Sequence, residues 1–79
     1  MSFFIYFDHT EGKTCRVGPA ATLTSDKCLY PFRLYDGDND LVFSGVSTKP
    51  DSFDPLDYAQ AIYGVTRIDY CTDGKWAML

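Results

Sequence analysis

The chain has 79 residues but only one glutamate, one histidine and three cysteines, and it has no long hydrophobic run. A membrane-spanning helix needs about 18–20 apolar residues in succession, so none is expected. The opening segment has neither a basic stretch nor a small-residue cleavage site, so we expect no secretory signal and a cytoplasmic protein. Glycine-rich phosphate-binding motifs and nucleophile motifs are missing as well, so we expect no enzyme activity and no cofactor.

The cysteines and the histidine do not form the spacing of a reactive or metal-binding site. Cys15, Cys28 and Cys71 contain no close pair, whereas a zinc site uses four ligands that usually come in such pairs. A thiol nucleophile would need His9 beside one of the cysteines. Disulfide frameworks belong mainly to secreted chains. We therefore expect free thiols and no metal, and the pattern assigns the cysteines no role.

Negative charge is in excess, at a formal net charge of −4, and ten of the eleven acidic residues are aspartate. Aspartate is favoured in turns and at helix starts, so many of these residues should serve local structure. The alternative is an acidic surface that attracts a basic partner. The seven basic residues are scattered along the sequence, and without a basic cluster we expect no direct binding of nucleic acid.

Apolar and aromatic residues are abundant: 46% of the chain is hydrophobic and 16% is aromatic. Aromatic side chains bury large areas, so disorder is excluded and a single compact domain over residues 1–79 is expected. Six tyrosines are too many for one small core, because each buried hydroxyl needs a partner. Exposed tyrosine beside aspartate is typical of a protein-binding surface. The alternative is a sheet face covered by a homodimer partner.

Alternating apolar and polar residues predict six strands, at residues 2–8, 13–17, 29–35, 41–47, 65–71 and 75–79. Turn residues between consecutive strands predict three hairpins, and the Asp73-Gly74 pair fits a type I′ turn. The first strand places Phe3, Ile5 and Phe7 on one face and further aromatics on the other, which indicates a central strand or a covered face.

Two further strands carry specific expectations. Pro31 lacks a backbone donor, which indicates either an edge strand or the first residues of a strand. Trp76 and Met78 alternate along the last strand and are expected to point inward.

One helix is predicted at residues 55–63. Asp54 is the expected N-cap, with Pro55 and Asp57 in the first turn, and Gly64 is expected to end the helix in the left-handed conformation. The inner stripe of this helix is predicted to consist of Leu56, Ala59, Ile62 and Tyr63. The fold class is therefore α+β: an antiparallel sheet of about five to six strands in β-β-β-β-α-β-β order, with one short helix packed on one face.

Acidic turns supply the first candidates for partner binding. Asp36, Asp38 and Asp40 alternate through one turn and resemble the first half of a calcium loop. A calcium loop needs glycine at its sixth position and glutamate at its twelfth, where this chain has Leu41 and Ser47. A plain hairpin turn or a recognition surface is therefore the better interpretation.

Further candidates come from the last hairpin, the helix and the tyrosines. Asp69 and Asp73, on the last hairpin, are candidate acidic contacts together with the 36–40 turn. A second acid-rich stretch is the weaker candidate, since helix capping explains two of its three members; it consists of Asp51, Asp54 and Asp57. Tyr35 and Tyr58 are the candidate aromatic contacts of such a surface.

Several segments carry a resemblance to a known class of protein. They are the first strand, the helical unit at residues 57–65, Arg67-Ile68-Asp69, and Asp73-Gly74-Lys75-Trp76. In a small, acidic, aromatic-rich chain, this helix–strand–hairpin ending resembles those of phage-encoded anti-CRISPR proteins that inhibit type I systems. The resemblance covers less than half of the chain and carries over no active site.

The resemblance implies an inhibitor that binds the Cascade surveillance complex in an infected bacterial host and blocks target DNA, partly as a DNA mimic. A chain of this length has a radius of gyration of about 12 Å and spans roughly 30 Å. Over that length duplex DNA carries about 18 charges. Eleven carboxylates cannot copy them along a whole face, so we expect the protein to plug one basic cleft of a protein partner, as a monomer or weak homodimer.

The alternative is a small phage or bacterial accessory protein, such as an antitoxin-like or morphogenesis partner, with no CRISPR role. Its binding would depend on the aromatic face more than on the aspartate turns. Salt distinguishes the two hypotheses, since electrostatic plugging weakens steeply with ionic strength and aromatic docking does not.

Overall fold

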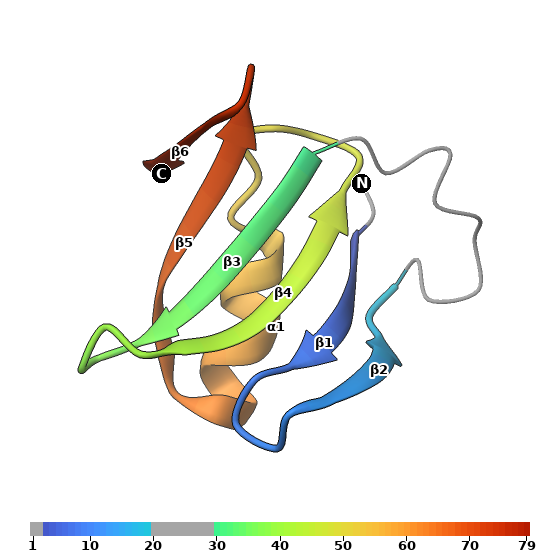
Figure 1. Ribbon diagram of the computed structural model, residues 1–79, viewed down its shortest axis with the longest axis vertical. Helices are drawn as coiled ribbons and strands as arrows, with labels where there is room; N and C mark the ends of the chain where they lie inside the picture. Colours follow the sequence, from blue (N-terminus) through green and yellow to red (C-terminus); the bar gives the residue numbers. More distant parts are fainter. Residues whose placement is uncertain (1–2, 20–29) are drawn as a thin grey trace.

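The computed structural model of the protein describes residues 3–19 and 30–79, apart from the side chain of Ile62. Its elements are β1 (Phe3–Asp8), β2 (Lys13–Val17), β3 (Tyr30–Asp36), β4 (Leu41–Ser47), α1 (Asp54–Tyr63), β5 (Val65–Thr72) and β6 (Lys75–Met78). The strands form one antiparallel sheet in the order β2-β1-β4-β3-β5-β6 (Figure 1). The predicted α+β fold is confirmed, while Cys28 and the strand start predicted at Leu29 lie outside the described residues.

All three predicted hairpins form: β1 pairs with β2, β3 with β4, and β5 with β6. The last turn has the backbone that its sequence predicts, since Asp73 and Gly74 adopt φ values of 54° and 79°. Pro31 lies near the start of β3, which is an interior strand, and pairing with β5 begins one residue later, at Phe32. The edge-strand alternative for Pro31 is therefore wrong and the strand-start alternative is right.

The helix follows from the strand order. Both β4 and β5 pair antiparallel with β3, so they run parallel to each other with β3 between them. Parallel strands cannot be joined by a tight turn and need a crossover of a dozen or more residues. Residues 48–64 supply it, and Figure 1 shows α1 lying against one face of the sheet. No helix of the described residues covers the opposite face, which we call the uncovered face.

The helix begins one residue earlier than its sequence suggests. Phe53 is the N-cap and makes no side-chain capping bond, so the prediction that Asp54 caps the helix is wrong. The amide of Asp54 instead donates to the Ser52 hydroxyl at 3.1 Å, and the Tyr70 hydroxyl donates to the Ser52 carbonyl oxygen at 2.7 Å. This anchor on β5 sets the start of the helix. Its end is as predicted, at Gly64 with φ 71°.

The inner side of α1 is narrower than predicted. Ala59 is fully buried, Leu56 is half-buried against the core, and Pro55 is buried as well. Tyr63 is 49% exposed, so its placement in the inner stripe is wrong, although one side of its ring meets Phe43 at a centroid distance of 4.7 Å. The predicted contribution of Ile62 lies outside the described side chains.

The core lies between α1 and the covered face of the sheet. Aromatic rings meet edge to face at its centre: the Phe32 ring lies 6.1 Å from that of Phe3 and 6.0 Å from that of Tyr70. The buried cluster consists of Phe3, Ile5, Phe32, Leu34, Val42, Phe43, Ala59, Val65, Ile68 and Tyr70. The radius of gyration is 11.3 Å and the longest extent is 32 Å, close to the values expected for this length.

A bulge in β1 changes the face on which Phe7 lies. Ile5 pairs with Gly45 of β4 and Phe7 with Ser44, so the register shifts between Ile5 and Phe7. One extra residue moves the following side chains to the other face of the sheet. Phe7 therefore lies on the uncovered face, and the prediction that it shares a face with Phe3 and Ile5 is wrong.

The last strand also differs from its prediction. Trp76 is 40% exposed and Met78 69% exposed, so neither points inward. Their cross-strand neighbours on β5 are Cys71 and Asp69, which alternate with the buried Ile68 and Tyr70. Paired residues of neighbouring strands point to the same face of a sheet, so these two side chains lie on the uncovered face.

Gly45 is required by the close approach of two neighbours. A Cβ at this position would lie 2.4 Å from the Phe32 Cζ atom and 2.4 Å from the Phe4 carbonyl oxygen. We expect Gly45→Ala to lower the free energy of unfolding by about 1–3 kcal/mol, the usual cost of overpacking, measured by urea denaturation.

Gly37→Ala is the matched control, because no described atom lies within 4 Å of the place that its Cβ would take and its φ is not positive. It should change stability by no more than about 0.5 kcal/mol. Equal effects of the two substitutions would show that the Phe32 ring does not pack over Gly45.

Candidate functional site

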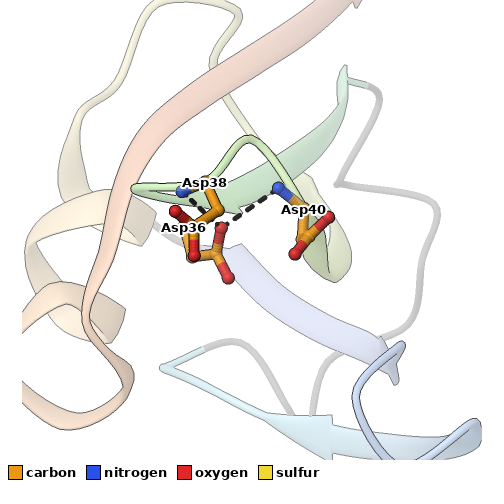
Figure 2. Close-up of side chains that lie close together, drawn as sticks. All are labelled: Asp36, Asp38 and Asp40. Carbon is orange, nitrogen blue, oxygen red and sulfur yellow. Dashed lines mark hydrogen bonds between the residues drawn. The ribbon is translucent and has the colours of Figure 1, made fainter.

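The turn between β3 and β4 is held by its first aspartate. One oxygen of Asp36, Oδ1, accepts the amides of Asp38 at 2.9 Å and Asp40 at 3.0 Å (Figure 2). The backbone closes around the same residue: Asn39 donates its amide to the Asp36 carbonyl oxygen, and Asp36 donates to that of Asp40, each at 3.1 Å. Asn39 takes a φ of 64°, which asparagine tolerates. The turn is therefore ordered by its own side chain.

Arg67 fastens this turn to β5. Its Nη1 donates to Asn39 Oδ1 at 2.9 Å, and its guanidinium lies 4.0 Å from the centre of the Tyr35 ring. Two further donors meet Asp69, Nε to Oδ1 at 3.0 Å and Nη2 to Oδ2 at 3.3 Å. One arginine thus joins the turn, a ring of β3 and a carboxylate of β5. We call residues 36–40 together with Arg67 the braced acidic turn.

This arrangement concentrates negative charge in a small volume. Three carboxylate oxygens, one from each of Asp36, Asp38 and Asp40, lie within 4.8 Å of one another. Asp38 and Asp40 are exposed, whereas Asp36 is half-buried. Such a group can attract a metal ion or a cationic side chain.

The structure does not gather the predicted acidic residues into one surface. Asp36 pairs with Val65 at the start of β5, and Asp73 follows Thr72 at the other end of that strand. At about 3.3 Å per residue, these two ends are roughly 23 Å apart. The side chain of Asp69 is only 14% exposed and is paired with Arg67. Asp69 and Asp73 therefore do not join the group of carboxylates in the 36–40 turn.

The second acid-rich stretch lies with Asp73 rather than with the braced acidic turn. Residues 51–57 lead into α1, whose start is tied to Tyr70 near the end of β5. Burial raises the pKa of the Tyr70 hydroxyl, and the negative charges of Asp54 and Asp51 raise it further. These carboxylates thus lie close to Tyr70, and Asp57 lies one helical turn further along.

The two candidate tyrosines are not free aromatic contacts. Tyr35 is half-buried and supports the Arg67 guanidinium. Tyr58 is half-buried on α1, and its ring packs edge to face on Phe3 at a centroid distance of 5.6 Å. The more exposed tyrosines are Tyr6 and Tyr63, so the prediction that some tyrosines remain exposed is confirmed, at other positions.

Three arginines lie on the uncovered face, each over an aromatic ring. Arg16 lies 4.2 Å from the centre of the Phe4 ring, and Arg33 lies 4.1 Å from that of Trp76. Arg67 over Tyr35 is the third. The basic residues are scattered along the sequence, and this grouping was not predicted from it. A signal was available for two of them, because Arg16 and Arg33 each stand between two apolar residues in their own strand.

Other side chains complete the uncovered face. A hydrogen bond of 2.7 Å joins His9 Nε2 to Ser44 Oγ, and the rings of His9 and Phe7 lie 4.7 Å apart. Arg33 stands opposite Ser44 on one side and opposite Asp69 on the other. This face is therefore aromatic and cationic, while the acidic groups lie mainly at the ends of the sheet.

The two described cysteines, Cys15 and Cys71, are free thiols, as expected. Burial raises the pKa of the Cys15 thiol, which points toward the Ile5 carbonyl oxygen at 3.8 Å. A raised pKa disfavours the nucleophilic thiolate.

No pocket is found over residues 3–19 and 30–79. Among the same residues, the single helix is too short to cross a membrane. Comparisons with models of protein families, with curated proteins and with solved structures find no match for this chain.

Arg67 is expected to order the turn through its bond to Asn39. Replacing it, as Arg67→Gln, should speed hydrogen exchange of the Asp38 and Asp40 amides about fivefold, the factor for losing a net bond of about 1 kcal/mol. Exchange is measured by NMR on the labelled protein. Arg33→Gln is the control on the same face, since Arg33 lies over Trp76 and not against the turn. Unchanged exchange in Arg67→Gln would show that Asp36 alone orders the turn.

Proposed function

We propose that the protein acts by binding a protein partner with a basic surface, and that the braced acidic turn is the contact. The observation that carries this proposal is the double support of the turn, by Asp36 from within and by Arg67 from β5. Ordering the turn in advance reduces the entropy lost on binding. Exposed carboxylates at Asp38 and Asp40 then attract and orient a cationic partner.

The specific form of this proposal is a non-enzymatic inhibitor of a type I CRISPR surveillance complex, acting in the cytoplasm of an infected bacterial host. The resemblance of the helix–strand–hairpin ending supports this form. The close spacing of three carboxylates supports plugging one basic cleft that target DNA would enter. The distance between the two acidic ends argues against mimicry of a longer stretch of duplex.

A second candidate function is supported by a different surface. Arg33 over Trp76 lies on the uncovered face, next to the exposed Met78. A stacked arginine beside apolar side chains is typical of binding hot spots. An accessory protein without a CRISPR role would bind its partner through this face.

The test is a pull-down of the tagged protein against purified type I surveillance complexes, followed by a gel shift with target DNA. The variant Asp38→Lys/Asp40→Lys changes the braced acidic turn and spares Asp36, whose carboxylate builds it. The variant Asp51→Lys/Asp57→Lys is the control with the same change in net charge. We expect the first variant to weaken binding at least about tenfold and the control to weaken it far less. Salt screens the attraction between the partner and those charges that lie more than about 10 Å from the contact.

The outcomes separate the alternatives. No binding to any complex would contradict inhibition of a type I system. Binding that leaves the DNA shift intact would contradict exclusion of target DNA. Equal weakening by both double variants would contradict the turn as the specific contact. Binding that survives Asp38→Lys/Asp40→Lys but is lost in Arg33→Ala would favour the uncovered face and the second function.

A further inference from the structure

The two edge strands of the sheet are protected to different degrees against pairing with a strand of another chain. The edge strand β2 carries Lys13 and Arg16, and its pairing with β1 contains a register shift. Charges and bulges of this kind discourage pairing with another chain. The other edge strand, β6, pairs with β5 without a shift, and Lys75 at its start is its one charged residue. The edge at β6 therefore has none of these protections along Trp76–Met78.

The hydrogen bonds of β6 show which backbone groups are unpaired. Leu79 donates its amide to the Ile68 carbonyl oxygen at 3.0 Å. Hydrogen-bonded residues alternate along an antiparallel pair, so Lys75 and Ala77 also direct their backbone groups toward β5. The N–H and C=O groups of Trp76 and Met78 consequently point to the open side of the sheet.

We propose that two copies of the protein associate through β6, antiparallel and with a two-fold axis at Ala77. This register places Trp76 of one copy opposite Met78 of the other. In each such pair the N–H of either residue donates to the C=O of the other. All N–H and C=O groups of Trp76 and Met78 that point away from β5 are then hydrogen-bonded. Their side chains lie on the same face, where sulfur and indole make a favourable contact. The two sheets then continue as one across the axis.

The occupant is a second copy because the strand is complementary to itself in this register. Lys75 stands opposite Leu79 of the other copy, so like charges do not face each other. The exposed apolar residues at the edge, Trp76, Met78 and Leu79, are 40%, 69% and 40% exposed. Three partly exposed side chains fall well short of the roughly 800 Å² per partner of a stable interface, so the dimer is weak and forms at high concentration.

This association goes beyond the proposed function and does not depend on it. The braced acidic turn lies between β3 and β4, away from β6 (Figure 1). The two-fold axis places the two turns at opposite ends of the joined sheet, so both stay accessible. A partner with two basic sites would be held by both copies at once, which raises the apparent affinity.

The test is sedimentation velocity of the full chain from about 10 μM to about 1 mM, the range in which so small an interface dissociates. We expect the mean mass to rise toward that of a dimer. Met78→Lys, which places a charge on the edge, should raise the dissociation constant at least about tenfold. Thr14→Lys puts the same charge on the exposed β2 edge and should leave the dissociation constant unchanged.

Amide hydrogen exchange identifies the strand involved. Protection of the Trp76 and Met78 amides should rise with protein concentration, while the Ala77 amide, already bonded to β5, should change little. A monomer at all concentrations would overturn the proposal. So would a dimer that persists in Met78→Lys, or one in which protection rises elsewhere and not at Trp76 and Met78.

Discussion

The parallel relation of β4 and β5, with β3 between them, is the constraint on which the rest of the structure depends. It requires one crossover, and this crossover carries the helix of the described fold. The helix buries one face of the sheet and provides the core around Phe32. A single helix cannot cover both faces, so polar and aromatic side chains must complete the other one. The strand order thus explains why the sheet has one face covered by the helix and one uncovered face.

On the uncovered face, arginine side chains stacked on aromatic rings cover the apolar surface that a second layer of helices would otherwise cover. Long arginine side chains cover apolar surface while their charged ends stay in water, and each guanidinium gains from the ring beneath it. Arg67 serves the site as well, because it meets Asn39 of the acidic turn while it lies over Tyr35. Packing of the uncovered face and order in the turn therefore depend on the same side chain.

Local patterns predicted the fold well, because turns, alternation and the Gly64 helix end are encoded by neighbouring residues. Features that depend on distant partners were not predictable in the same way. The bulge that moves Phe7 to the other face depends on register with β4, and the exposure of Trp76 depends on β6 being an edge. For the candidate site, the spacing of its aspartates singles out the 36–40 turn, and its role in binding stays a prediction. The role of Arg67 and the separation of Asp73 from that turn appear only once the strands are assembled.

Whether arginine–aromatic stacks organise the uncovered face can be measured by proton NMR of the Arg33 side chain. A guanidinium 4.1 Å from the centre of the Trp76 ring lies in the shielding region of the indole. We expect upfield-shifted Arg33 side-chain resonances, cross-relaxation with the indole protons, and loss of both in Trp76→Ala. Arg33 resonances at the positions of an unstructured peptide, with no such cross-relaxation, would show that the stack does not form.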